Sequence, residues 1–167
     1  MIPNTTTDRI VKTAVLKAPL ARVWSAVSDS REFGAWFGVE FDGPFVAQSP
    51  VSGRIRPTTV DPEVAKLQEP HAGTPFTIVV DRVEPMHTFS FRWHPYAVGD
   101  ADLSKEPMTL VSFELAEVPD GTAITITESG FDAIPLERRA AAFSANDGGW
   151  THQLRLVAKY VQQQAAR

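Results

Sequence analysis

Cysteine is absent from the 167-residue chain. Its absence excludes disulfide bonds, thiolate zinc sites, cysteine nucleophiles and iron–sulfur clusters held by cysteine. The four histidines stand apart, and neither the HxH nor the HExxH spacing of a metal site occurs among them. We therefore expect no metal ion and no other cofactor.

Clustered positive charge and long apolar runs are missing too. The 16 Lys and Arg residues are scattered and are outnumbered by 20 Asp and Glu residues, which gives a formal net charge of −4. Because nucleic-acid binding needs a clustered basic face, we expect no nucleic-acid partner. No apolar run approaches the roughly 20 residues of a membrane span, and the N-terminal residues do not resemble a secretory signal. The sequence predicts a cytoplasmic protein without a membrane span.

The composition is that of an ordinary folded chain, with 43% hydrophobic and 22% charged residues. The length falls in the single-domain range of about 100–200 residues. No repeat, low-complexity tract or linker argues for a second unit, so we expect one domain over residues 1–167.

The C-terminal segment has the pattern of one long helix over residues 135–164. Its face is spaced by alternating steps of four and three residues, which is helical spacing. The members of this face are Leu136, Ala140, Phe143, Asp147, Trp150, Leu154, Val157 and Val161. A helix of this length would extend about 45 Å at 1.5 Å per residue and needs a broad apolar partner.

Strand patterns elsewhere supply that partner. Residues 8–17 read as a first strand, followed by a helix beginning near Pro19 and a second short helix over residues 31–35. Alternating apolar residues predict antiparallel strands within residues 74–83, 87–93, 108–117 and 122–129. This order predicts an α+β fold in which a curved antiparallel sheet grips the C-terminal helix.

Six prolines interrupt residues 44–75. Strands near this segment must be short, and we expect them at residues 39–42 and 53–60, with one or two helical turns over residues 61–68. The segment looks like an inserted loop, and such loops often border a binding site.

Four segments, in this order, resemble the SRPBCC superfamily of START-like helix-grip proteins. They are APLARVWSAVSDSREFGAWFG, VEPMHTFSFRW, DGTAITITESGF and GGWTHQLRLVAKYV. Within the superfamily they are most similar to bacterial homologues of the activator of heat-shock-protein-ninety ATPase. The resemblance covers roughly residues 8–161 and departs at residues 59–73. It implies a hydrophobic cavity between the sheet and the C-terminal helix but little about chemistry, because the superfamily includes lipid carriers, hormone receptors, cyclases and co-chaperones.

An aromatic-rich set of residues could line such a cavity. It consists of Phe76, Phe89, Phe91, Trp93, Val111 and Phe113 on the strands, and Phe143 and Trp150 on the helix. The alternative for each of these residues, taken alone, is that it packs in a filled core and does not line a cavity. Trp36 and Phe37, at the end of the second short helix, are expected at one mouth of the cavity.

Glu128 is the sharpest polar candidate for ligand binding. It follows Ile124 and Ile126 with a period of two, which points its side chain inward, where an unpaired carboxylate would be costly. The carboxylate then either pairs with a residue such as His94 or His152, or anchors a ligand. The alternative is a bulge at residues 128–130 that turns Glu128 to solvent.

Asp147 is the second polar candidate. It precedes Gly148 and Gly149, each of which costs about 1 kcal/mol relative to alanine inside a helix, so they suggest a kink or a close approach by a strand or ligand. The alternative is that the helix bends there and Asp147 reaches water.

Three functions remain open from the sequence. The first is binding of a small hydrophobic ligand, lipid-like or aromatic, without catalysis. The second, resting on the resemblance alone, is a co-chaperone-like interaction that stimulates a chaperone ATPase. The third is an enzyme acting on a hydrophobic substrate, with Glu128 or His94 as general acid or base. No serine has a GxSxG context, so no catalytic residue is assigned. Self-association is also left open.

Overall fold

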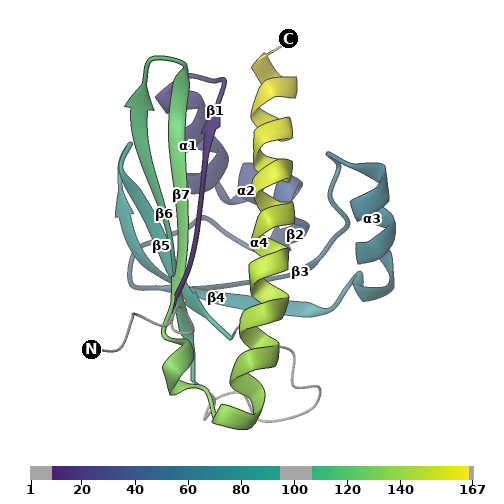
Figure 1. The fold of residues 1–167 in the computed structure, drawn as a ribbon. Helices are drawn as coiled ribbons and strands as arrows, with labels where there is room; N and C mark the ends of the chain where they lie inside the picture. The colour runs from purple at the N-terminus through teal and green to yellow at the C-terminus, as the bar shows by residue number, and fades with distance from the viewer. Residues whose placement is uncertain (1–8, 95–106, 166–167) are drawn as a thin grey trace, which may run out of the picture.

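A single antiparallel sheet of seven strands organises the structure, a computed structural model that describes residues 9–94 and 107–165. Its strand order is β1-β7-β6-β5-β4-β3-β2. The strands are β1 (Arg9–Leu16), β2 (Val39–Phe41), β3 (Pro50–Ile55), β4 (Pro75–Glu84), β5 (Thr88–Trp93), β6 (Thr109–Val118) and β7 (Gly121–Ser129). The sheet curves around the long helix α4 (Leu136–Ala165), which crosses in front of β3 and β4 in Figure 1. This arrangement confirms the helix-grip fold expected from the sequence.

Short helices connect the strands. They are α1 (Leu20–Ser28), α2 (Ser30–Phe37) and α3 (Pro62–Gln68), with 3₁₀ turns η1 (Glu69–His71) and η3 (Phe131–Ala133). The Asp29 side chain accepts hydrogen bonds from the first backbone N–H groups of α2, and Asp61 does the same for α3. Gly38 ends α2 in the left-handed conformation, with a φ of 102°. α3 stands apart from the sheet in Figure 1 and contains no buried residue.

The third strand differs from the prediction. We expected it at residues 53–60, but β3 begins at Pro50 and ends at Ile55. Proline is tolerated at the first residue of a strand, and Pro50 pairs with Val79 in the register to β4. Beyond Ile55 the chain leaves the sheet, and Thr58 instead donates a hydrogen bond from its hydroxyl to the Ala35 carbonyl oxygen.

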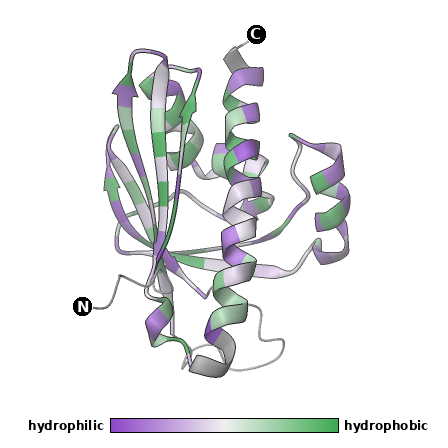
Figure 2. Ribbon diagram, in the orientation of Figure 1, coloured by the Kyte–Doolittle hydropathy of each residue, from purple (hydrophilic) through white to green (hydrophobic). Residues whose placement is uncertain are grey.

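Helix α4 buries a face that overlaps only partly with the predicted one. Trp150, Val157 and Val161 are buried as expected, but Ala140 is exposed. Among the side chains of this helix that the structure describes, the other buried ones are Ala142, Leu156 and Tyr160. The predicted face also included Leu136, whose side chain lies outside the described part. A pattern averaging 3.5 residues drifts by about 20° per heptad around a helix of 3.6 residues per turn, which moves the buried face. Figure 2 shows hydrophilic and hydrophobic residues interspersed along the coloured part of α4.

None of the helices in the described part of the chain is both long enough and apolar enough to cross a membrane.

Candidate functional site

Glu128 lies at the centre of the polar interior. Strand β7 keeps its regular alternation through this residue, which pairs with Ile10 of β1 and Val111 of β6. Its side chain points between the sheet and α4 and is completely buried, with 0% exposure. The inward orientation that the period of two predicts for Glu128 is therefore confirmed, and the alternative of a bulge that turns Glu128 to solvent is wrong.

Four side chains donate hydrogen bonds to the Glu128 carboxylate. The indole Nε1 of Trp93 donates to Oε2 and that of Trp150 to Oε1, both at 2.8 Å. The Thr109 hydroxyl donates to Oε2, and Asn146 Nδ2 lies 2.9 and 3.1 Å from the two oxygens. These donors come from β5, β6 and α4, whereas the expected partners were His94 or His152. Because a carboxylate has about four lone-pair positions, its accepting capacity is filled.

A small pocket lies beside this carboxylate cluster, with a volume of about 90 Å³. Its walls are formed by Phe37, Trp93, Asn146, Gly149, Trp150 and Gln153. The ring centroid of Phe37 lies 6.0 Å from that of Trp93 and 6.1 Å from that of Trp150, and the two indoles are 5.6 Å apart. The pocket thus combines three aromatic rings with two amide side chains.

The amide of Gln153 is only half satisfied. Its Nε2 donates to the backbone oxygen of Phe37 at 3.2 Å, while its Oε1 is buried and accepts no hydrogen bond. Gln68 of α3 donates to the same backbone oxygen at 3.1 Å, and its own Oε1 accepts from the Thr58 N–H at 2.7 Å. The C-terminal carbonyl of α2 is therefore held from two sides, by α3 and by α4.

Several predicted site residues lie in the filled core instead of the pocket wall. Phe89, Phe91, Val111, Phe113 and Trp36 are at most 1% exposed. Ring centroids in this group lie 5.8 to 6.3 Å apart, as in the pairs Phe89–Phe91 and Trp36–Phe113. Trp36 is not at the mouth, since its indole donates inward to the Ala26 carbonyl oxygen. The structure places these side chains against one another.

Two further predicted aromatic residues, Phe76 and Phe143, are not part of the pocket wall. Phe76 is partly buried, and its ring centroid is 5.9 Å from those of Phe37 and Trp93, so it supports the pocket wall from behind. Phe143 packs on Phe131 at a centroid distance of 5.2 Å and does not line the pocket.

Asp147 faces away from the pocket. Its side chain is 47% exposed and forms an ion pair with Lys12 of β1 at 3.1 Å. Helix α4 continues through Gly148 and Gly149, and a Cβ atom at either glycine would meet nothing within 4 Å. The expected close approach of a strand is therefore wrong, and the alternative in which Asp147 reaches water describes the structure better.

Sequence reasoning missed Asn146, Gln153 and Thr109. Asn146 is four residues before Trp150, and Gln153 is three residues after it. Helical spacing therefore places Asn146 and Gln153 on the same face of the helix as Trp150. Thr109 is buried and continues the inward period of two formed by Val111, Phe113 and Leu115. The spacing in the sequence therefore places all three residues on buried faces, but a polar residue type on a mostly apolar face does not by itself indicate a binding site.

A second polar cluster joins the other half of α4 to α1 and α2. The Tyr160 hydroxyl donates to Glu32 at 3.0 Å, Arg22 donates to the same carboxylate at 2.7 Å, and Ser25 donates to its other oxygen. Burial, and then the hydrogen bond to Glu32, raise the pKa of Tyr160 above its ordinary value. This cluster fixes the C-terminal half of α4.

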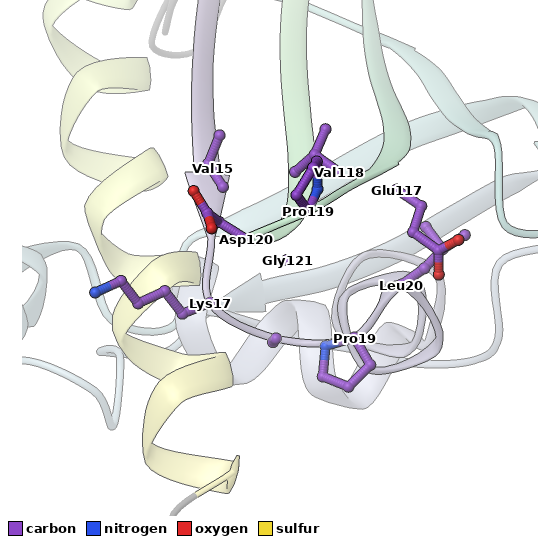
Figure 3. Close-up of a pocket in the computed structure, with 10 residues that line it drawn as sticks. Val15, Lys17, Pro19, Leu20, Glu117, Val118, Pro119, Asp120 and Gly121 are labelled. Atoms are coloured by element: carbon purple, nitrogen blue, oxygen red, sulfur yellow. The ribbon is translucent and has the colours of Figure 1, made fainter.

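An open groove lies at the far end of the sheet, between the β6–β7 turn and the connection from β1 to α1 (Figure 3). Gly121 lies in its floor with a φ of 143°, and a Cβ there would lie 2.0 Å from the Leu16 oxygen. The groove is wide, about 930 Å³, but no buried polar atom without a partner is found in it. The Glu128 pocket is the better candidate site among the described residues.

The curved sheet and the long C-terminal helix that it grips, with a pocket between them, are the helix-grip architecture of the SRPBCC superfamily. More narrowly, the chain belongs to the family described as Activator of Hsp90 ATPase homolog 1-like protein, whose sequence model matches residues 17–162. This match confirms the resemblance found in the sequence.

Solved structures share the fold. DynU16, a protein in the dynemicin biosynthetic locus, is 24% identical with a TM-score of 0.65, over 93% of this chain and 47% of that chain. MLL2253 from Mesorhizobium loti is 17% identical with a TM-score of 0.68, over 93% and 97%. CalU16 from Micromonospora echinospora is 17% identical with a TM-score of 0.61, over 95% and 79%. This chain thus spans about half the length of DynU16, and these likenesses show the fold alone. No curated protein matches the chain.

Proposed function

We propose that the protein binds a small hydrophobic molecule, one end of which enters the pocket between the sheet and α4. The observation that carries this proposal is the convergence of Phe37, Trp93 and Trp150 with two amide side chains on one pocket. Apolar walls with a few placed polar groups are typical of small-molecule sites.

The pocket's size limits how much of a ligand it can hold. Its volume of about 90 Å³ is below the roughly 300–1,000 Å³ of common ligand sites. Deeper entry would have to displace the packed rings of Phe91 and Phe113, whose centroids lie 6.3 Å apart. The ligand's buried end is therefore small, about one ring, and the remainder lies outside the mouth.

The bonding of Glu128 supports binding over catalysis. A general base must have a free lone pair within reach of the proton that it abstracts. Both oxygens of Glu128 already accept hydrogen bonds, from Trp93 and Thr109 on one side and Trp150 and Asn146 on the other. In this role the carboxylate holds the two indoles in place as pocket walls.

Tryptophan fluorescence tests the proposal, because two of the four tryptophans line the pocket. Titration with a panel of aromatics, phenols and fatty acids is expected to change the emission for some of its members. Native mass spectrometry of freshly purified protein checks for a bound molecule independently. No change with any member of the panel, together with no co-purifying mass, would contradict ligand binding.

Two neighbouring glycines provide matched variants. Both are exposed and free of contacts at the Cβ position, but only Gly149 belongs to the pocket wall. Gly149→Leu is expected to weaken binding about tenfold or more, a loss of about 1.4 kcal/mol. Gly148→Leu should bind within about twofold of the unmodified protein. Equal affinities of the two variants would place the ligand elsewhere.

The family match favours one alternative, stimulation of a chaperone ATPase. A coupled assay of ATP hydrolysis by the chaperone, with and without this protein, measures it directly. An unchanged hydrolysis rate at saturating protein would dispose of this alternative without affecting the ligand-binding proposal.

A further inference from the structure

Gln153 Oε1 is the one buried side-chain polar atom in the described part of the chain that has no hydrogen-bond partner. Gln153 follows Trp150 by three residues on α4 and forms part of the pocket wall. Leaving a buried acceptor without a donor is unfavourable, and such exceptions call for a physical explanation.

The orientation of the Gln153 amide is set by its surroundings. The Phe37 backbone oxygen can only accept a hydrogen bond, so the amide nitrogen must face it, as it does at 3.2 Å. Rotating the amide by 180° would bring two oxygens together. The group left without a partner is therefore an acceptor, whichever way the amide is first assigned.

Gln68 shows that this arrangement can be completed within the protein. It donates to the same Phe37 oxygen, and its Oε1 accepts from the Thr58 N–H at 2.7 Å. Gln68 is not part of the pocket wall, whereas Gln153 is. Both glutamines donate to the Phe37 carbonyl oxygen. Only Gln153, which borders the pocket, has an amide oxygen without a hydrogen-bond partner.

The side-chain nitrogens of the pocket wall are all engaged as donors. Those of Trp93, Trp150 and Asn146 donate to Glu128. That of Gln153 donates to Phe37. An amide NH₂ group has two N–H bonds, so Asn146 and Gln153 can each still donate once more. Gln153 Oε1 is nevertheless the polar side-chain atom of the pocket wall that has no hydrogen-bond partner at all, and it is an acceptor. The negative charge of Glu128 behind the wall disfavours an anion.

We propose that the pocket selects neutral molecules whose buried end is an aromatic ring bearing a hydrogen-bond donor, such as a phenol or an aniline. The ring stacks against Phe37, Trp93 and Trp150. A small rotation of the Gln153 side chain, whose Oε1 is buried at the pocket wall, lets this oxygen accept a hydrogen bond from the O–H or N–H group of the ligand. This inference rests on the proposed function and specifies the class of ligand for the same site.

Three probes of similar size separate the contribution of the hydrogen-bond donor from that of the aromatic ring. They are p-cresol, which has a donor, and toluene and 4-methylanisole, which have none. Binding is followed by NMR through the indole N–H signals of Trp93 and Trp150. We expect p-cresol to bind about 3–10-fold more tightly than either of the others, the range of one net hydrogen bond. The anion 4-methylbenzoate is expected to bind more weakly than p-cresol.

Gln153→Met keeps the length of the side chain but removes the acceptor, so the preference for p-cresol should disappear. Gln68→Met removes the matching hydrogen bond to Phe37 and should leave the preference intact. Equal binding of the three probes to the unmodified protein, as when water alone satisfies Gln153, overturns this inference while ligand binding stands. Binding of none of them within the solubility of the probes overturns the proposed function, and the inference falls with it.

Discussion

Glu128 shows how a carboxylate can be buried in this fold without a cation. Transfer of a carboxylate from water costs several kcal/mol, which charge-assisted hydrogen bonds can offset. Here the donors are two indoles, a hydroxyl and an amide. The same bonds satisfy the N–H groups of two tryptophans in the interior, so one residue orients both aromatic walls of the pocket.

Glu128→Gln is expected to lower the free energy of unfolding by about 2–4 kcal/mol. The new NH₂ group must face two of the present donors, and each donor left without an acceptor costs about 1–3 kcal/mol. Urea denaturation followed by circular dichroism measures the change. The fluorescence of the native protein should change as well, because Trp93 and Trp150 lose their fixed partner.

Glu114→Gln is the matched control for this substitution. Glu114 lies on the exposed face of β6, and the same chemical change there should alter stability by no more than about 0.5 kcal/mol. Equal effects of the two substitutions would mean that the carboxylate cluster does not stabilise the fold.

The direction of Glu128 could be predicted from the sequence, but its partners could not. Alternation along a strand fixes which face a side chain lies on. Which donors meet it depends on the rotation of α4 about its axis and on the register that pairs Trp93 with Thr109. The local sequence pattern contains neither the rotation of α4 nor this register, so it suggests two histidines as partners although the structure has two tryptophans.

Helix α4 is the element whose extent was easiest to predict. It was expected over residues 135–164 and is observed at Leu136–Ala165, because its apolar spacing persists over many turns. Its contacts were harder to predict, since they depend on two polar clusters. One contains Asn146 and Trp150, and the other contains Tyr160, whose hydroxyl donates to Glu32.

Tyr160 is expected to titrate above pH 10, the ordinary value for tyrosine, because burial and its hydrogen bond to Glu32 raise its pKa. Its contribution to stability is therefore full below pH 10 and is lost as the pH rises through the folded-state pKa. The difference in tyrosinate absorbance between the unmodified protein and Tyr160→Phe isolates its titration. A midpoint at or below 10 would contradict the buried hydrogen bond.

At the scale of the whole molecule, the fold followed from the need of each apolar face for a partner. Strands with one apolar face each and one long amphipathic helix can be combined in only a few arrangements. The helix grip is the one that covers every apolar face. The free volume inside could not be predicted in the same way. Whether aromatic rings fill a space or line it depends on side-chain packing, and here most of them fill it, leaving about 90 Å³ at one side.

The two polar clusters on α4 are expected to contribute independently to the stability of the whole protein. Trp150 and Tyr160 are ten residues apart, about 15 Å along the helix, and effects at such distances usually add to within about 0.5 kcal/mol. The unfolding free energies of Glu128→Gln, Tyr160→Phe and the double variant test this in a double-mutant cycle. A coupling above about 1 kcal/mol would contradict independence and would mean that α4 docks onto the sheet as a single unit, so that loosening one end releases the other.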